Sequence, residues 1–223
     1  QTGRADNDTN GNSLRRARFG VKGKVAKDFD YLLLADFSPE KDGNIDEGYV
    51  SYNASNEFRV RVGKFKMPFS LEQLTSSNNI DFMERSLVGS VEGEFIPAKQ
   101  VGAMLFGNPT PATSYALAMY AGNTKTSKSV TSNTNKDATY DRPDFVGRVT
   151  ANVAEMAGNK DVVTHLGLAY GVSTTKAIAA DGIEATSEGK GDKVFKSNAV
   201  AAGTDVYRLG VEAAVAYEAF KLQ

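Results

Sequence analysis

A two-residue alternation between charged and apolar side chains is the feature that most limits how this sequence can fold. In SLRRARFGVKGKVAKDF, residues 13–29, the odd positions from 17 to 25 are apolar or glycine. Four even positions carry positive charge: Arg16, Arg18, Lys22 and Lys24. Because successive side chains of a β-strand point to opposite faces of a sheet, this stretch predicts a strand with a column of cations on one face.

The same pattern returns along the chain and predicts an all-β fold. In FRVRVGKFK, residues 58–66, Arg59 and Arg61 oppose apolar neighbours. About nine such strands can be counted, and the only short helix expected lies at residues 71–74. Residues 1–12 are polar and predict a flexible lead-in, and residues 13–223 predict one β domain. The least periodic part of that domain is residues 70–99, which is too long for an ordinary connector.

Alternation alone leaves two architectures open. In a soluble sandwich the apolar face packs into a core, whereas in an outer-membrane barrel it meets lipid and the polar face lines a lumen. Strands of about 8–13 residues fit the ~9–11 residues that cross a bilayer at a tilt. Aromatic residues near the strand ends and the alternation of short and long connections also favour an antiparallel transmembrane β-barrel.

Composition excludes several classes of site. The 26 basic and 27 acidic side chains give a net charge of −1, so net charge predicts no nucleic-acid partner. The chain has no cysteine and one histidine, His165, which excludes thiolate and multi-histidine metal sites. We therefore expect no metal, no cofactor and no enzymatic activity. A hydrolase that pairs His165 with a serine such as Ser86 remains an alternative that the spacing does not require.

Longer stretches of the chain resemble one family of proteins. The segments LRRARFGVKGKVAKDFDYLLLADFS and VRVGKFKMPFSLEQLTSSNNIDFMERS, with the later RPDFVGRV and GVEAAVAYEAFKLQ, are similar to the phosphate-selective porin (O/P) family of Gram-negative outer membranes. The resemblance implies a sixteen-stranded barrel, of which this chain would supply about the first nine strands. It also implies a multi-pass protein in outer-membrane lipid, assembled as a homotrimer, with residues 70–99 as the loop that constricts the pore.

Cations on a water-filled wall lower the Coulomb cost of moving an anion through a narrow hole, and arginine donates paired hydrogen bonds to phosphate. From the alternation and the resemblance we predict that ten side chains bind anions or line the pore. They are Arg15, Arg16, Arg18, Lys22, Lys24, Arg59, Arg61, Arg85, Lys99 and Arg148. Asp30 and Asp36 lie on the same predicted face and are expected to pair with arginines of the neighbouring strand.

The predicted function is passive diffusion of anions, with inorganic phosphate or polyphosphate as the expected substrate among small anions. Transport of this kind needs no cofactor. The alternative is a structural or adhesive outer-membrane barrel that conducts little, and a soluble β-sandwich is a further alternative.

Overall fold

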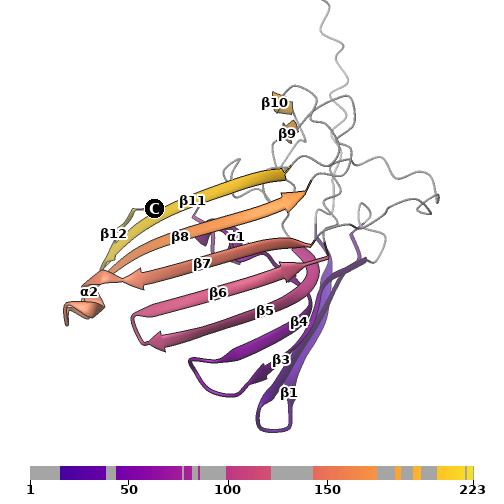
Figure 1. The fold of residues 1–223 in the computed structure, drawn as a ribbon, viewed down its shortest axis with the longest axis horizontal. Coiled ribbons are helices and arrows are strands. Elements are labelled where there is room, and N and C mark those ends of the chain that lie inside the picture. Colours follow the sequence, from indigo (N-terminus) through magenta and orange to yellow (C-terminus); the bar gives the residue numbers. More distant parts are fainter. Residues whose placement is uncertain are drawn as a thin grey trace, which may run out of the picture.

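The fold is mostly β, in a computed structural model that describes residues 16–38, 44–76, 78–81, 85, 99–121, 143–174, 184–186, 193–196, 205–218 and 220–222. Ten strands form one antiparallel sheet in the order β1-β2-β3-β4-β5-β6-β7-β8-β11-β12, and two short strands, β9 and β10, pair separately. Nearly every strand of the large sheet therefore pairs with its sequence neighbours, and the sheet curls along its length (Figure 1).

The elements follow one another along the chain as β1 Arg18–Val25, β2 Phe29–Asp36, β3 Asn44–Asn53, β4 Arg59–Lys66, α1 Leu71–Leu74, β5 Lys99–Thr110, β6 Thr113–Tyr120, β7 Asp144–Asn152, α2 Val153–Met156, β8 Val162–Thr174, β9 Glu184–Thr186, β10 Lys193–Lys196, β11 Asp205–Tyr217 and β12 Phe220–Leu222.

The two faces of the sheet differ in what covers them. The inner face packs against the segment that follows β4, residues 67–75. Met67 and Phe69 of this segment are buried together with side chains of the inner face: Phe65, Met104, Ala118, Tyr120, Val146 and Ala169. The core of the described structure is thus small, and it lies between one sheet face and a single segment of chain.

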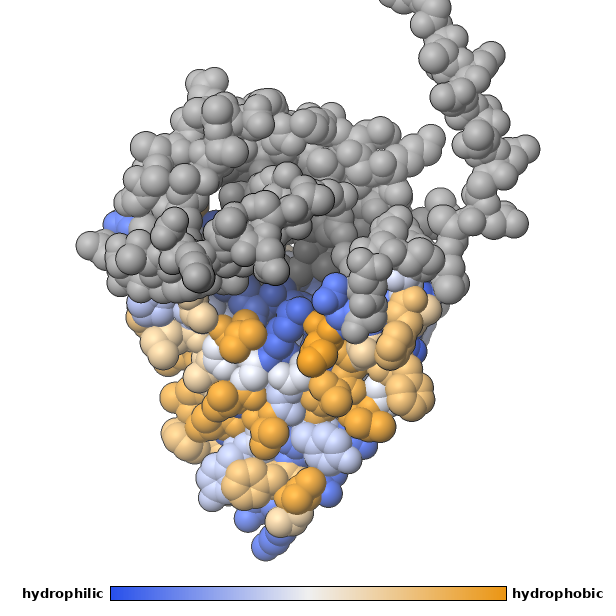
Figure 2. Space-filling view, turned by 90° about the vertical axis from the view of Figure 1, so that its right-hand side faces the viewer, coloured by the Kyte–Doolittle hydropathy of each residue, from blue (hydrophilic) through white to orange (hydrophobic). Residues whose placement is uncertain are grey.

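The outer face carries large apolar side chains that no described segment covers. Along β11, Leu209 is 70% exposed and Val211 is 79% exposed. Tyr207 and Tyr217 stand at the two ends of the same face, where aromatic girdles occur in membrane barrels. Figure 2 shows hydrophobic side chains spread over one side of the molecule, with hydrophilic residues at its lower tip.

These observations confirm the predicted all-β antiparallel fold. The described residues form twelve strands, ten of them in the main sheet, where about nine were expected along the chain. The additional strands β9, β10 and β12 have only three or four residues each, too few to show an alternation. The expected short helix is present as α1, with the Ser70 hydroxyl accepting a hydrogen bond from the Gln73 amide as its N-cap. The predicted lead-in, residues 1–12, lies outside the described residues. Among the residues described, no helix is long and apolar enough to cross a membrane.

Candidate ion-binding surface on the inner face

A mixed cluster of charges joins the ends of β1, β2, β3 and β5. Arg18 Nε lies 3.1 Å from Asp36 Oδ2 and 3.2 Å from Asp46 Oδ2. Lys99 Nζ lies 2.6 Å from Asp46 Oδ2 and 3.1 Å from Glu47 Oε1, and its side chain is only 8% exposed. The expected pairing of Asp36 with an arginine is therefore confirmed. We call these five residues, Arg18, Asp36, Asp46, Glu47 and Lys99, the rim cluster.

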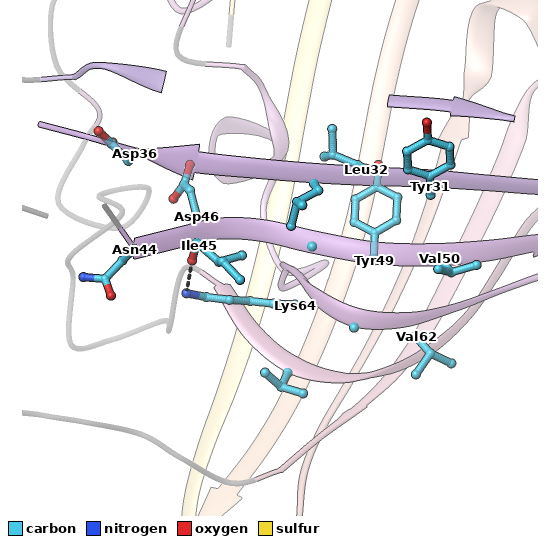
Figure 3. Close-up of a pocket in the computed structure, with 14 residues that line it drawn as sticks. Tyr31, Leu32, Asp36, Asn44, Ile45, Asp46, Tyr49, Val50, Val62 and Lys64 are labelled. Atoms are coloured by element: carbon cyan, nitrogen blue, oxygen red, sulfur yellow. Dashed lines mark hydrogen bonds between the residues drawn. The ribbon is translucent and has the colours of Figure 1, made fainter. Parts of the chain in front are cut away.

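A β-bulge in β3 creates the acidic half of the rim cluster. Leu34 pairs with Glu47, but the next residue, Ala35, pairs with Ile45, so Asp46 is an extra residue without an opposite partner. Asp46 and Glu47 are consecutive, yet both reach Lys99. Figure 3 shows Asp46 and Tyr49 on one side of β3 and Ile45 on the other. A hollow of about 1190 Å³ beside them is lined mainly by apolar residues of the outer face, such as Leu33, Val50 and Val62.

Arg59 and Arg61 on β4 have different direct contacts, which are aromatic rings and neutral oxygens. The guanidinium carbon of Arg61 lies 3.9 Å from the centre of the Tyr49 ring and 5.0 Å from that of Phe106. The guanidinium carbon of Arg59 lies 4.8 Å from the same Phe106 ring. Arg61 Nε donates to Ser51 Oγ at 3.1 Å, and Arg59 donates to Asn108 Oδ1.

Within the described part of the chain, no direct contact with a carboxylate neutralises this pair of arginines. No described carboxylate forms an ion pair with Arg59 or Arg61, and no described group accepts a hydrogen bond from the buried Arg59 Nε. Contact with the face of an aromatic ring stabilises a guanidinium without neutralising it. We call Arg59, Arg61, Tyr49 and Phe106 the stacked arginine pair.

The cations of β1 lie on the inner face but differ in their contacts. The register places Lys22 opposite Leu32 and Lys24 opposite Asp30, and both lysines are exposed. Asp30 accepts a hydrogen bond from Asn53 Nδ2. Arg16 precedes β1 and is half-buried with a partner. Arg15 lies outside the described residues.

Arg148 belongs to a junction between β7, β8 and β11. Its Nε donates to Glu212 Oε1 at 3.1 Å, and His165 Nε2 lies 2.8 Å from the same oxygen. Glu212 Oε2 accepts a hydrogen bond from the backbone amide of Leu71, the first residue of α1. His165 therefore contacts a carboxylate that two further donors share, and Ser86, its suggested partner in a hydrolase, lies outside the described residues.

Arg85 and Lys66 hold the end of α1. Arg85 Nε donates to the Glu72 carbonyl at 3.2 Å, and Arg85 also donates to the Thr75 carbonyl at 2.8 Å. Lys66 Nζ donates to the Leu74 and Thr75 carbonyls, each at 3.2 Å. These contacts satisfy carbonyls that a helix leaves without partners at its carboxyl end.

Sequence reasoning missed three charged side chains that make contacts on the inner side of the sheet. Glu212 and Arg208 stand opposite the apolar face of β11, so the alternation gave their side of the strand but not their partners. Arg208 donates to Ser173 Oγ. Lys66 has the wrong parity for the inner face, and it reaches α1 because the chain turns inward directly after β4. Each of these contacts joins residues that are distant in sequence or lie at a strand end.

An antiparallel sheet with an exposed apolar outer face and a charged inner face is the arrangement found in the walls of outer-membrane β-barrel proteins. Within that class, the model of the family "phosphate-selective porin O and P" matches residues 2–223, and the chain belongs to this family. An uncharacterized protein of Aquifex aeolicus (strain VF5) is 26% identical over 160 residues, which cover 66% of this chain and 39% of that relative. The chain thus spans about two fifths of the length of the relative it matches.

Membership confirms the predicted family and places the protein in the outer membrane, among porins and not among enzymes. A porin of this family is a β-barrel, and the curled ten-stranded sheet is the part of such a wall that the structure describes.

Proposed function

We propose that the inner face lines a pore through which small anions diffuse passively, with the stacked arginine pair as its selecting element. The observation that carries this proposal is that Arg59 and Arg61 contact aromatic rings and neutral oxygens, whereas Arg18, Lys99 and Arg148 each contact carboxylates. An uncompensated cation attracts an anion more strongly than one already paired with a carboxylate.

The proposed substrates are inorganic phosphate, polyphosphate and similar oxyanions. A guanidinium that stacks on a ring through its face still presents N–H groups at its edge, and these groups match two oxygens of a phosphate. Lys22 and Lys24 are exposed on the same face and form no ion pair with a described residue, so we assign them to the approach of the anion. The rim cluster, whose cations already have carboxylate partners, is assigned a structural role.

Residues 70–99 are proposed to narrow this pore. The proposal is supported by the described part of the segment, because residues 70–75 run along the inner face and Leu71 bonds to β11. We further propose a homotrimer in outer-membrane lipid, as the family resemblance suggests. The mass of the detergent-solubilised protein, measured by light scattering, would test the trimer.

The central experiment is a measurement of ion selectivity in planar bilayers with protein purified from outer membranes. Reversal potentials under a salt gradient are expected to show anion selectivity, and phosphate is expected to block the chloride current. Arg59→Ala and Arg61→Ala should each weaken the block by roughly tenfold, which corresponds to about 1.4 kcal/mol. Arg18→Ala is the matched control, since it removes an arginine of the same face that already has carboxylate partners.

Three results would contradict this assignment. Cation selectivity would reject the anion pore. An equal loss of block in Arg18→Ala and Arg61→Ala would reject the stacked arginine pair as the selecting element. A protein that inserts into bilayers but does not conduct would favour the structural or adhesive alternative.

A further inference from the structure

The wall formed by β8 and β11 contains a recess that fits the segment after β4. Gly171 on β8 and Gly210 on β11 lie under the ring of Phe69, which is 5% exposed. A Cβ atom built on Gly210 would lie 2.9 Å from Phe69 Cε1, which is too close for a real contact, and one on Gly171 would lie 3.7 Å from Phe69 Cε2. The missing side chain at position 210 is therefore what allows Phe69 to approach the wall.

A third glycine makes room for a polar contact beside this recess. A Cβ atom on Gly167 would lie 2.2 Å from Glu212 Oε1, so glycine at this position leaves the space that the carboxylate occupies. Gly167 and Glu212 are paired across β8 and β11. From this position Glu212 binds Arg148 and His165 with one oxygen and accepts the Leu71 amide with the other.

We infer that Gly210 and Glu212 form a latch that holds residues 67–75 on the wall and thereby sets the aperture of the pore. Phe69 supplies an apolar contact with Gly210, and two residues along β11 Glu212 supplies a hydrogen bond to the backbone. Both contacts reach the same strand, which lies at the far side of the sheet from β4. The segment therefore crosses the inner face. Its first residue follows β4 in the chain, and its contacts with Gly210 and Glu212 attach it to β11.

Arg148 and His165 act in this arrangement as positioning residues for Glu212. Two donors on Oε1 fix the carboxylate so that Oε2 faces the Leu71 amide. A carboxylate with three donors is strongly held, because each hydrogen bond to a charged group contributes more than one between neutral groups. The effect on the aperture rests on the proposed function, whereas the attachment of the segment does not.

The first test compares Glu212→Ala with Glu212→Gln in planar bilayers at 1 M salt. At this concentration the screening length is about 3 Å, so conductance reports aperture more than charge. Glutamine keeps an oxygen that can accept the Leu71 amide, and alanine does not. We expect conductance to rise on the order of twofold in Glu212→Ala and to stay near the wild-type value in Glu212→Gln. Equal conductance changes in the two variants would overturn the latch. The change would then follow from the loss of the carboxylate charge, which both variants share, and not from the loss of the hydrogen bond to Leu71.

The second test uses the recess and needs no change in charge. Gly210→Ala would press a methyl group against Phe69, whereas Gly171→Ala makes only ordinary contacts with Phe69 and Val146 and is the matched control. A spin label on Ser76→Cys, in a chain without other cysteines, reports the mobility of the segment. We expect a more mobile label in Gly210→Ala and in Glu212→Ala, and an unchanged label in Gly171→Ala and in Glu155→Gln, a carboxylate change on α2 outside the latch.

The two proposals fail in different ways. Cation selectivity of the wild type would reject the anion pore but leave the spin-label comparison valid as a test of the latch. An anion-selective wild type whose label mobility and conductance do not change in Glu212→Ala and Gly210→Ala would reject the latch alone.

Discussion

At the scale of single residues, the inner-face cations are distinguished by what they contact. Arg18 and Lys99 share Asp46, and Arg148 binds Glu212, so their fields are largely cancelled at short range. Arg61 instead lies over Tyr49 and donates to Ser51. The chemistry available to an anion therefore depends on the partners of a cation more than on the number of cations along a strand.

Arg61→Lys would separate charge from stacking. Lysine keeps the positive charge but loses the planar face that lies on Tyr49 and the paired donors at its edge. We expect anion selectivity to persist while phosphate block weakens about fivefold, which corresponds to about 1 kcal/mol of lost stacking. Lys24→Arg, on the same face and away from the rings, serves as the control and should leave the block unchanged. Wild-type block in Arg61→Lys would mean that charge alone selects the anion.

Lys99→Gln would leave the carboxylates of Asp46 and Glu47 side by side without their shared ammonium. Since the Lys99 side chain is only 8% exposed, we expect the free energy of unfolding to fall by about 1–3 kcal/mol. We also expect the reversal potential to move towards cations. Urea unfolding in detergent and bilayer recordings measure the two effects. The double variant Lys99→Gln with Glu47→Gln should recover part of both losses, and no recovery would argue against direct pairing.

Residue-scale contacts could be predicted from the sequence only where the two-residue period is unbroken. The alternation of positions along each strand correctly placed Lys22, Lys24 and Arg61 on the inner face. It could not give the joint contact of Asp46 and Glu47 with Lys99, because the bulge at Asp46 resets the period within β3. It also could not give Glu212 as the partner of Arg148, since the two positions are 64 residues apart and meet across β8.

At the scale of elements, β4 is the strand that carries the stacked arginine pair and then turns inward. Gly63 lies in this strand with a φ of +132°, a conformation that side chains with a Cβ rarely adopt. Its ideal Cβ would lie 2.2 Å from the carbonyl oxygen of Gly48 and 2.7 Å from Tyr49 Cα on the neighbouring strand. Glycine is thus required at position 63 for β3 and β4 to pair closely beneath Tyr49.

Gly63→Ala is therefore expected to destabilise the barrel wall by about 2 kcal/mol or more, through both backbone strain and steric overlap. The shift from folded to unfolded mobility on a gel with increasing temperature measures this loss. Gly48→Ala, opposite on β3, is the matched control, because its Cβ would meet only side-chain atoms of Ile45 and Leu33 at 3.4 Å. Equal melting of the two variants would contradict the requirement for glycine at position 63.

Strands and helices could be predicted from the sequence only where they are long enough to show a regular pattern of apolar side chains or a clear break in one. Strands with one apolar face, such as β1 and β11, show a clear alternation and were found. The helix α1 was expected because its sequence breaks the alternation, whereas α2 is a four-residue turn of helix at the end of β7 and left no distinct pattern. The stretch that predicts the first strand covers residues 13–29, and β1 occupies Arg18–Val25 within it, while residues 13–15 lie outside the described residues.

At the scale of the whole molecule, the main question is whether the outer face of the sheet contacts water or lipid. Val211 is the central residue of β11, and its side chain is 79% exposed on a face that carries Leu209 and Tyr207. The sequence predicted this apolar face but not the identity of the solvent. Family membership supplies that identity, since a porin wall meets lipid with its outer side.

Val211→Arg tests that orientation in a single position. A charge on the lipid face near the bilayer centre costs about 2–4 kcal/mol, whereas the same change on a soluble surface would be nearly neutral. We therefore expect a lower midpoint in reversible folding into lipid vesicles for Val211→Arg. Val211→Leu keeps the face apolar and is expected to fold like the wild type. Equal folding of both variants would place the outer face of β11 in water, because burial of the arginine against lipid would carry this penalty.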